Sequence, residues 1–543
     1  MTRPPDRLTK LPTELLAGVL ELLDAFTLVA CMLACRKLKI LIDNTMSLKY
    51  ILALEAAGMK DGHNSTLSLI ERAHRLDAYH SAWRTLTWSD ERVVTFPGDA
   101  VAFVSGGFLV AVEPPFVHIW QIPSKWRGVD ARPPLRLEFP SDEVHGVWIE
   151  PSEDLLAMFC EEGIELCSAS SGLPHPKPQI FDVELDPTVP VDVLGKFICG
   201  FSDEGGPSGY ATVYNWHTGN KMEVIWAIDL CLLEDEYLLV FEHVNATGDG
   251  ALVVYDCLAI DEGENLSPGD EILSLLLPAF RHGVSHDSSF GASPRGTRGN
   301  PHSGHFFSAQ SDVRLLRATI ELYPDFTVLP TFCQEGGRPA APAQRKTVPD
   351  FQVLILSSVV AKYIAASRRR RAFSEDAGPE PFEVPWNEWA PGNVLLRPAP
   401  WVPSGPFLPK SGCGCRALEL VRPDLVKIYD FHPWRVRRAA KAGARTETLT
   451  GRIEKEWLRP DAARSGEVFV DTFLECTTAE YAPPFEVDSV ANLMLAEDAL
   501  VIFPVRRSDL QFHICSATSH AVRRYTERCR DRRRGRSARS PCS

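Results

Sequence analysis

The residues that could carry chemistry in this chain of 543 residues are scattered cysteines, histidines and acidic pairs. One candidate for a metal site is Cys413-Gly-Cys415, with His432 as the next possible ligand 17 residues further on. Structural zinc uses four ligands at defined spacing, and these three residues do not supply them. We therefore predict a glycine-rich turn with incidental thiols, and we interpret Asp430 as a turn residue that caps a strand.

The sequence carries none of the common motifs for catalysis. It has no Gly-x-Ser-x-Gly elbow, no His-Glu-x-x-His pair, no phosphate-binding loop and no dinucleotide fingerprint. The acidic pairs Glu161-Glu162 and Glu234-Asp235 fall between expected strands, where solvated turns are the ordinary interpretation. We predict no catalytic residue, no cofactor and no metal ion.

An apolar segment close to the N-terminus is the strongest structural signal. The 21 residues from Leu15 to Cys35 include only two charges, Glu21 and Asp24, so their length permits a membrane helix. An acidic residue near the middle of such a helix costs roughly 3 kcal/mol on the insertion scale. A signal peptide also needs an uninterrupted apolar core. We therefore predict that the segment is soluble.

The segment divides into short amphipathic helices. Apolar residues repeat at helical spacing on both sides of a break, as Leu16, Val19, Leu20 and Leu23 before it and Leu28, Cys31, Met32 and Cys35 after it. Pro12 and Thr13 predict the first helix start, and Asp24 to Thr27 predicts the break, with Thr27 as an N-cap. A bundle of about 40 residues cannot hide this much apolar surface. The surplus must meet a partner or the rest of the chain.

The phrase Leu11-Pro12-x-Glu14-Leu15-Leu16-x-x-Val19-Leu20-x-x-Leu23, then Leu28 and Cys35-Arg36-x-Leu38, resembles the F-box. One departure is that many F-boxes carry an aromatic residue near Leu38. The F-box is the helical module that docks onto the Skp-type adaptor of cullin-based ubiquitin ligases. The resemblance implies ten residues as adaptor contacts without separating surface from core: Leu11, Pro12, Leu15, Leu16, Val19, Leu20, Leu23, Leu28, Cys35 and Arg36.

The residues after this module sharpen the resemblance. The phrases from Ser47 to Met59, Ser68 to Arg72 and Ala82 to Arg84 look like F-box proteins that mushroom-forming fungi carry in large numbers. In those proteins a helical linker leads into a long β-rich region. The spacing of Leu69, Ala73, Leu76, His80 and Trp83 predicts a linker helix with one face packed inward, and His80 at the boundary of that face.

From about Glu91 the pattern changes to short apolar runs separated by Gly, Pro, Asp and Ser, which predicts many short strands. Four runs end in comparable phrases, at Ile119-Trp120, Leu166-Cys167, Asn215-Trp216 and Tyr255-Asp256, with spacings of 47, 49 and 40 residues. A strand-end signature at this period is typical of β-propeller blades. A large β-sandwich is the alternative.

Two arginine-rich stretches stand out against an acidic chain. The net charge is −14, and residues 522–543 carry nine Arg against two acids, so the rest carries −14 − 7 = −21. Such an acidic body argues against nucleic-acid binding. The run Arg368 to Arg371 is interpreted as a solvated loop, with an import signal as the alternative.

Together these patterns predict an α+β multidomain protein. We expect a disordered N-terminus at 1–8, the F-box at 9–50, a helical linker at 51–90, a large all-β, propeller-like domain at 91–515 and a basic disordered tail at 516–543. Disordered insertions are expected near 286–304 and 335–350, which are polar and rich in Gly and Pro.

The resemblance implies a non-catalytic, substrate-recruiting subunit of an SCF-type ubiquitin ligase in the cytoplasm or nucleus. Its partners would be a Skp-type adaptor, through it a cullin, and a target protein that the sequence does not identify, with no nucleic acid and no membrane. Two alternatives stay open. One is a propeller scaffold outside any ligase, with the F-box-like helices as an intramolecular lid. The other is a propeller enzyme, which needs clustered carboxylates or a metal.

Overall fold

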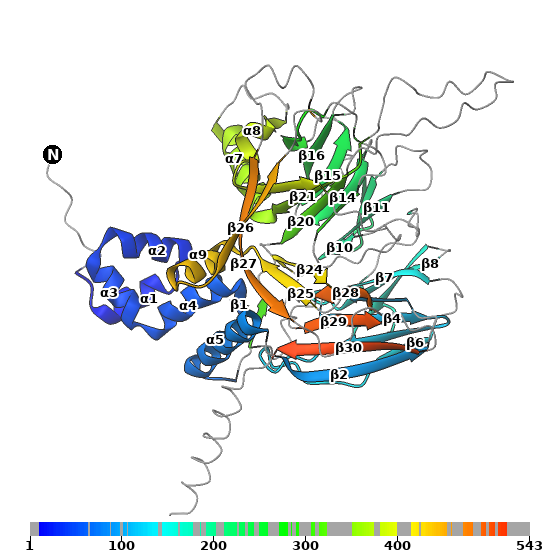
Figure 1. Ribbon diagram of the computed structural model, residues 1–543, viewed down its shortest axis with the longest axis horizontal. Helices are drawn as coiled ribbons and strands as arrows, with labels where there is room; N and C mark the ends of the chain where they lie inside the picture. Colours follow the sequence, from blue (N-terminus) through cyan, green and yellow to red (C-terminus); the bar gives the residue numbers. More distant parts are fainter. Residues whose placement is uncertain are drawn as a thin grey trace, which may run out of the picture.

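A small helical module at the N-terminus is followed by a large region of antiparallel sheets (Figure 1). The computed structural model describes residues 10–517 except 63–65, 87, 98–100, 106, 139–143, 161–162, 178–184, 186–191, 202–210, 225–226, 234–236, 244–248, 259–270, 281–283, 285–288, 293–305, 310–313, 323–349, 374–380, 399–413, 423–424, 453–457, 459–470, 482–489, 496–498 and 505–508.

Four helices form the module: α1 (Thr13–Leu20), α2 (Ala25–Ala34), α3 (Arg36–Asn44) and α4 (Met46–Ala57). Their shared core is built from leucines and one isoleucine, chiefly Leu16, Leu20, Leu28, Leu38, Leu41, Ile42 and Leu48. The predicted start at Pro12 and Thr13 is confirmed. The predicted N-cap at Thr27 is wrong, because the carboxylate of Asp24 caps α2 by accepting a hydrogen bond of 2.7 Å from the Thr27 amide.

The linker contains one short strand and one long helix, β1 (Met59–Asp61) and α5 (Leu69–Thr85). Helix α5 begins at a capping box in which the hydroxyl of Ser68 accepts from the Glu71 amide and the Glu71 carboxylate accepts from the Ser68 amide. The predicted inward face is confirmed, since Leu76 and Trp83 are buried and His80 is half-buried. The strand β1 was not predicted.

The β region consists of seven sheets of three to five strands in the described part of the chain. In chain order, the first sheet contains β3 (Val101–Ser105), β4 (Phe108–Glu113), β5 (Phe116–Gln121) and β6 (Leu135–Glu138), and the second contains β7 (Val144–Glu150), β8 (Leu155–Cys160) and β9 (Gly163–Ser168). The third contains β10 (Asp192–Leu194), β11 (Phe197–Phe201), β12 (Ala211–Asn215) and β13 (Lys221–Val224). The fourth contains β14 (Ala227–Leu233), β15 (Tyr237–His243), β16 (Gly250–Asp256) and β17 (Glu271–Leu276), and β22 (Phe382–Val384) pairs with β17 in parallel.

The other three large sheets use strands from more distant parts of the chain. They contain β18 (Ser289–Ala292), β20 (Leu315–Ile320), β21 (Phe351–Leu356) and β23 (Val394–Pro398); β24 (Arg416–Arg422), β25 (Leu425–Asp430), β27 (Asp471–Tyr481) and β26 (Thr446–Arg452); and β2 (Trp88–Pro97), β30 (Asp509–Ala517), β29 (Ala499–Pro504) and β28 (Val490–Leu495). A two-stranded sheet pairs β1 with β19 (Phe307–Ala309).

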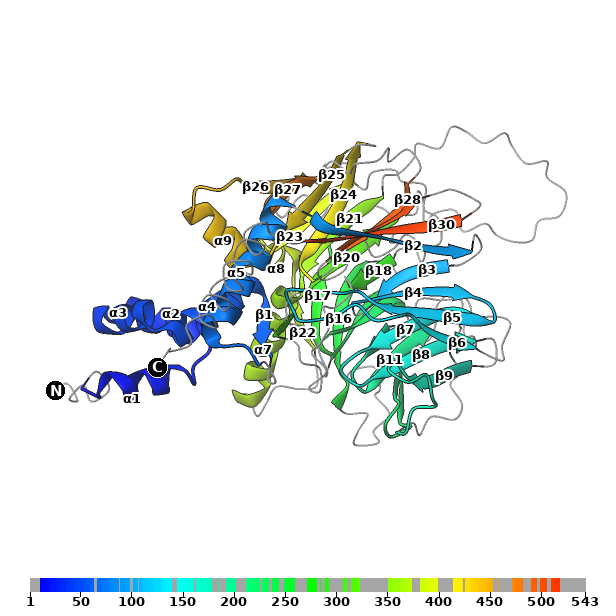
Figure 2. The ribbon, with the colours of Figure 1, turned by 90° about the horizontal axis from the view of Figure 1, so that it is seen from below.

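The first and last strands of the β region share one sheet. Strand β2 pairs antiparallel with β30 from Trp88↔Ala517 to Pro97↔Asp509. Each large sheet also contacts the next, through β4–β7, β7–β10, β10–β14, β14–β18, β23–β26, β24–β28 and finally β28–β3. Figure 2 shows these sheets beside one another, on the far side of α5 from the helical module.

The predicted strand-end phrases mark equivalent positions. They fall at the ends of β5, β9, β12 and β16, and each of these strands is the third in its sheet. The predicted apolar runs are confirmed as strands wherever they lie in the described residues. The period in the sequence therefore reports one strand from each of four successive sheets.

The β region is not all-β as predicted, because it contains α7 (Ser357–Phe373), α8 (Trp386–Trp389) and α9 (Pro433–Lys441). The run Arg368 to Arg371 is the last part of α7 and not a loop. Arginine is a good helix former, and cations at a helix C-terminus are favoured by the helix dipole. Part of the predicted insertion at 286–304 is strand β18, which pairs with β20.

Several predicted features lie outside the described residues: the N-terminus 1–8, the insertion at 335–349, the acidic pairs Glu161-Glu162 and Glu234-Asp235, and the tail from 518. None of the helices in the described part of the chain has the length and apolar character needed to cross a membrane.

We predict that Gly451→Ala destabilises the β region by about 1–3 kcal/mol, the usual cost of overpacking. Gly451 lies on β26, where an added Cβ would overlap the backbone carbonyl of Leu396 on β23. Thermal unfolding measures the effect. Gly18→Ala in α1 is the matched control, since nothing lies within 4 Å of that Cβ. Equal stability of both variants would contradict the close contact between β23 and β26.

Candidate protein-docking site

The helical module exposes an unusual amount of apolar surface. Of the 11 large apolar residues that are exposed in the described part of the chain, seven lie in this module, and we call them the apolar surface set: Leu15, Val19, Leu22, Phe26, Leu33, Ile40 and Met46. Leu22 and Leu33 are 86% and 85% exposed. Soluble proteins seldom gather so many apolar side chains on one small surface unless it binds something.

The structure divides the ten residues that the sequence suggested as adaptor contacts. Exposed members are Pro12, Leu15, Val19 and Arg36, and half-buried members are Leu11, Leu23 and Cys35. Buried members are Leu16, Leu20 and Leu28, which belong to the core of the module. These three leucines shape the module from inside, because their side chains are already covered by its own helices.

Five members of the apolar surface set were missed by the sequence reasoning: Leu22, Phe26, Leu33, Ile40 and Met46. The signal was present for the first four, since each falls off the i, i+3, i+4, i+7 stripe that marks the buried face. An apolar residue opposite the buried stripe of a short helix is a candidate for an outward contact.

The module is joined to the β region by backbone pairing. Strand β1 pairs with β19 from Met59↔Ala309 to Asp61↔Phe307, and the Gly62 amide donates to the Phe306 carbonyl at 3.0 Å. Arg75 on α5 adds a side-chain contact. Its guanidinium donates to the Lys125 carbonyl at 2.7 Å and lies 4.4 Å from the centre of the Phe306 ring.

A buried ionic cluster forms the centre of this joint. The carboxylate of Asp430, at the end of β25, pairs with Arg416 at 3.4 Å and, more closely, with Arg435 of α9. It also accepts from the His432 amide at 3.1 Å, which confirms the predicted strand-capping turn. The two guanidinium groups hold the pKa of Asp430 well below its usual range despite its burial.

The two arginines reach from the β region to α4 of the helical module and to α5 of the linker. The Nη2 atom of Arg435 donates to the Ala57 carbonyl at 3.1 Å, at the C-terminus of α4. The Nη1 atom of Arg416 donates to the Tyr79 hydroxyl at 3.2 Å, and its guanidinium lies 4.0 Å from the Trp83 ring centre. A cation at a helix C-terminus and a guanidinium over an indole are both favourable contacts.

His432 is sealed in the same joint. It is 1% exposed, and neither ring nitrogen has a hydrogen-bond partner among the described residues. Burial, with Arg435 second, lowers the pKa of His432 to about 3, so the ring is neutral. A Cβ on Gly58 would lie 3.0 Å from the His432 Nε2 atom, which is too close. Gly58 also has φ +59°, a left-handed conformation that residues with a side chain rarely adopt.

The thiol considered as a metal ligand lies in this cluster. Cys415 is buried, and burial raises its pKa to about 12. Its sulfur lies 3.6 Å from an Asp430 oxygen and 3.7 Å from Arg435, while Cys413 falls outside the described residues. No group of three or more His, Cys, Asp or Glu in the described residues could hold a metal ion.

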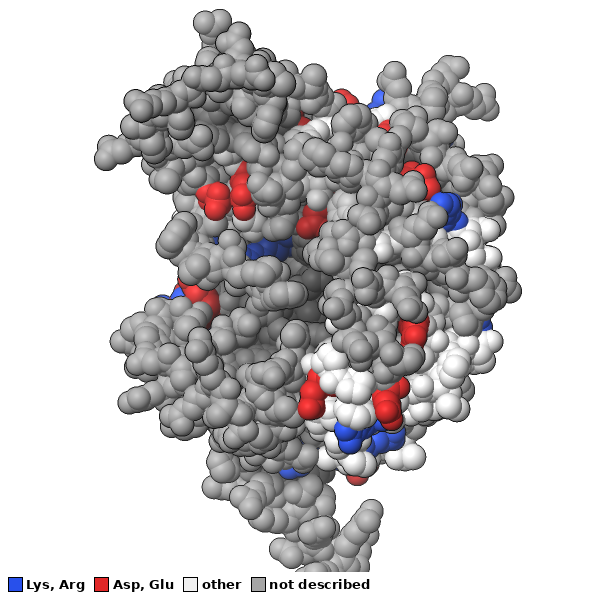
Figure 3. All heavy atoms as spheres, turned by 90° about the vertical axis from the view of Figure 1, so that its right-hand side faces the viewer, with Lys and Arg blue, Asp and Glu red and all other residues white. Residues whose placement is uncertain are grey.

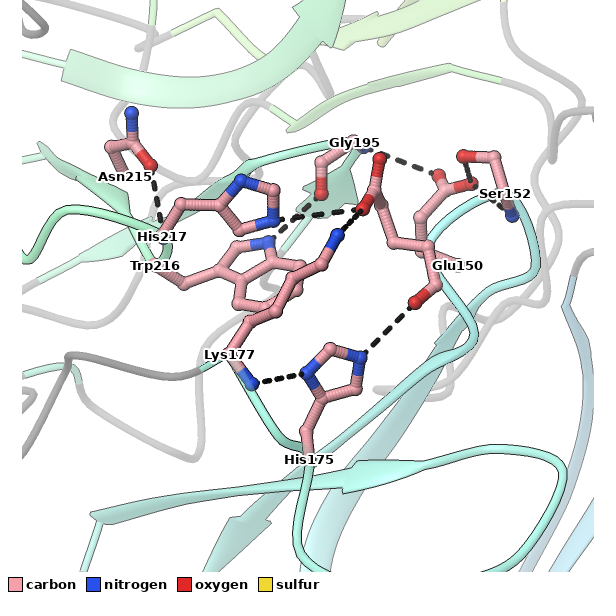
Figure 4. A network of polar contacts seen from close by, with 9 residues as sticks. Glu150, Ser152, His175, Lys177, Gly195, Asn215, Trp216 and His217 are labelled. Atoms are coloured by element: carbon pink, nitrogen blue, oxygen red, sulfur yellow. Dashed lines mark hydrogen bonds and ion pairs between the residues drawn. The ribbon is translucent and has the colours of Figure 1, made fainter.

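A second polar network ties two neighbouring sheets together (Figure 4). The carboxylate of Glu153 lies 3.4 Å from Nζ of Lys177 and 3.5 Å from Nε2 of His217. The backbone carbonyl of Glu153 lies 3.1 Å from Nε2 of His175. The indole of Trp216 is fully buried and donates to the Gly195 carbonyl at 2.8 Å. The strand-end phrase Asn215-Trp216 therefore serves packing between sheets.

One acidic cluster bears on the enzyme alternative. Glu242 on β15 accepts from the Tyr255 hydroxyl on β16 at 3.3 Å, and burial followed by the nearby Glu271 raises the pKa of Glu242 to about 8. Two acids and a tyrosine could in principle transfer protons. They face one another across three adjacent strands and do not line the cavity described below, so we assign them no reaction.

The face turned away from the module carries both signs of charge in its described part, with Lys, Arg, Asp and Glu side chains interspersed (Figure 3). Most of the atoms in that view belong to residues outside the described ranges. We therefore assign no binding surface there.

A family model described as the F-box domain matches residues 8–50. These residues include the helices α1 to α3 and the start of α4, which carry the whole apolar surface set. The chain contains an F-box domain. F-box proteins are in general non-catalytic substrate receptors of SCF complexes, in which the F-box binds a Skp-type adaptor that is linked to a cullin.

Similarity to other proteins is otherwise weak. No curated protein matches the sequence. A crystal structure of the tricorn protease is 11% identical with a TM-score of 0.32, covering 80% of this F-box protein, which spans only 36% of that chain. A crystal structure of a eukaryotic initiation factor is 9% identical with a TM-score of 0.28, over 78% of this chain and 87% of the other. TM-scores this low carry no inference.

We predict that Arg435→Met destabilises the joint by about 3 kcal/mol, because it removes one of the two cations that stabilise the buried charge of Asp430. Arg438→Met on the same helix is the matched control, since Arg438 and its partner Asp77 are 57% and 75% exposed. The control should change stability by less than about 0.5 kcal/mol. Chemical denaturation measures both, and equal effects would contradict the account of the joint.

We predict that His432→Asn flattens the acid dependence of stability. A histidine in the unfolded chain takes up a proton near pH 6.5, whereas His432 in the folded chain does so only near pH 3. Between these values the unfolded state binds more protons, so the folded state loses stability as the pH falls. Denaturation from pH 7 to pH 4 measures the slope.

The slope should not vanish in His432→Asn, because burial also lowers the pKa of His80. His74→Asn, an exposed position on the same helix as His80, is the control. If His432→Asn and His74→Asn changed the slope by the same amount, His432 would not be responsible for it.

Proposed function

We propose that this F-box protein recruits a target protein to an SCF-type ubiquitin ligase, in the cytoplasm or the nucleus. The observation that carries the proposal is the apolar surface set on the F-box, seven exposed side chains on four short helices and the turn between the first two. The ligase would act by holding the target close to its catalytic subunits, which raises the effective concentration of the reacting groups. The chain itself would contribute binding and no chemistry.

The apolar surface set supplies enough free energy for such docking. Burying a large apolar side chain stabilises a complex by roughly 1.5–3 kcal/mol. Six or seven such residues give on the order of 10–20 kcal/mol, and association itself costs about 4–15 kcal/mol. The exposed residues Pro12, Leu15, Val19 and Arg36 from the original set, together with Leu22, Phe26 and Leu33, are the proposed adaptor contacts.

The β region is the proposed target-binding part, and we infer that its seven sheets are the blades of an irregular β-propeller. Two observations support the inference. Each sheet contacts the next and the last contacts the first. The earliest strand of the β region, β2, completes the sheet of the final strands β28 to β30, which would close the circle of blades by joining the first and last strands. On this basis the F-box, the linker and the propeller begin near residues 9, 51 and 91.

A second candidate is a scaffold in which the β region masks its own F-box. It is favoured by one contact, in which Trp434 of α9 meets Phe26 of α2 edge-on at 5.4 Å between ring centres. Against it, Phe26 remains 61% exposed. An α9 that served as a lid would cover more of the apolar surface set than this one side chain.

Capture of a Skp-type adaptor by the full chain tests the proposal. We expect the wild-type chain to retain the adaptor and the double variant Leu22→Asp/Leu33→Asp to lose at least 100-fold in affinity, since two carboxylates would be desolvated in the interface. Leu173→Asp is the matched control, because Leu173 is exposed in the β region at 66%.

Three results would count against the proposal: no capture by the wild-type chain, equal loss in the control, or no loss in the double variant. Trp434→Ala separates the second candidate. A lid predicts that this change strengthens adaptor capture, whereas the ligase proposal predicts little change.

A further inference from the structure

A cavity of about 170 Å³ lies where α7 crosses the junction of two sheets. One face of α7 lines it, through Ser357, Ala361, Ile364, Ala365 and Arg368, which follow one another at helical spacing. The opposite wall consists of Leu233 at the end of β14, Tyr237 at the start of β15, and Arg314 just before β20. The cavity thus combines an apolar floor with two guanidinium groups and two hydroxyls.

Arg314 is held in place at the inner wall. It is 4% exposed, and its Nη1 atom donates to the Leu232 carbonyl at 3.0 Å. Its backbone is fixed to α7, since the Arg314 amide donates to the Ser357 hydroxyl and the Ser357 amide donates to the Arg314 carbonyl, both at 2.8 Å. A guanidinium positioned in this way is preorganised, because little entropy is lost when it binds a further acceptor.

Arg368 lies at the outer rim. Its side chain is 46% exposed, its guanidinium is 4.9 Å from the Tyr237 ring centre, and it pairs with Asp256 at 3.2 Å. A guanidinium has five N–H donors and can hold several acceptors at once. Stacking on Tyr237 sets the plane of the guanidinium beside the cavity.

We propose that this cavity binds an acidic side chain, a carboxylate or a phosphate on a short apolar stem, of a protein segment. The two guanidinium groups match a planar or tetrahedral anion, and the leucine, isoleucine and alanines match the stem. A protein segment is favoured over a free anion because the positive surface continues beyond the cavity. Arg370 and Arg371 are exposed on the last turn of α7 and extend this positive surface by about one helical turn, roughly 5 Å.

This site deepens the proposed function, since it names an acidic segment as the target that the β region would hold. Arg371 is placed by a hydrogen bond of 2.7 Å from its Nη2 atom to the Glu271 carbonyl, and Arg370 lies over the Phe382 ring at 5.4 Å. These contacts spread the arginines along the end of the β14–β17 sheet. In the bound segment, an acidic residue on either side of the one that enters the cavity would therefore lie close to one of these arginines.

The test measures the anisotropy of a fluorescein-labelled decapeptide of alternating glutamate and leucine bound to the full chain. Arg368→Gln should weaken its affinity about ten-fold, the usual effect of losing one charge-assisted hydrogen bond. Ala365→Trp, which fills the cavity from the exposed face of α7 and alters no charge, should abolish binding. Arg369→Gln is the matched control, because Arg369 is exposed on the same helix without lining the cavity, and it should change affinity less than two-fold.

The proposal is overturned if the peptide does not bind, if Arg369→Gln weakens it as much as Arg368→Gln, or if Ala365→Trp binds normally. Glutarate and inorganic phosphate serve as competitors. If either displaces the peptide at a concentration equal to the peptide's own, the ligand is a free anion and the protein segment is ruled out. Adaptor capture by the same variants should be unchanged, so failure here is distinguishable from failure of the proposed ligase role.

Discussion

The buried carboxylate of Asp430 is the interaction on which the two halves of the molecule depend. It pairs with two buried guanidinium groups, and an unpaired charge in the interior would cost several kcal/mol. Each guanidinium then reaches a different helix, Arg435 the end of α4 and Arg416 the middle of α5. Removing the carboxylate would leave both cations buried without their common partner.

This joint gives the F-box a defined position. Backbone pairing between β1 and β19, the ionic cluster, and the apolar contacts of Tyr79 and Trp83 all act between the linker and the β region. A recruiting subunit gains from such rigidity, because effective concentration falls when the distance between two sites is poorly defined. The same rigidity fixes the distance between the two proposed binding surfaces, the apolar surface on α1 to α3 and the cationic surface beside α7.

The helices of the F-box and most strands could be predicted from the sequence because their signals are local. Leucines at helical spacing mark α1, and runs such as those in β8 and β11 are apolar throughout since both faces are covered. The arginine run misled the prediction because its charge resembles a loop, although its residues favour helix. The core leucines Leu16 and Leu20 could not be told from contact residues by pattern alone.

The joint could not be predicted, because its members are distant in the sequence. Arg416 and Tyr79 are 337 residues apart, and Arg435 and Ala57 are 378 apart. Only the fold brings them together. Asp430 was correctly interpreted as a turn residue, yet nothing next to it in the sequence reveals the second role of its carboxylate.

The most direct test of the account is the distance between the F-box and the β region in solution. Spin labels on Lys39 of α3 and Lys221 of β13, both exposed, would be attached through unnatural amino acids, which leaves the native cysteines unlabelled. The account predicts one narrow distance distribution by pulsed electron paramagnetic resonance, which broadens in Asp430→Asn. A broad distribution in the wild-type chain would contradict a rigid joint.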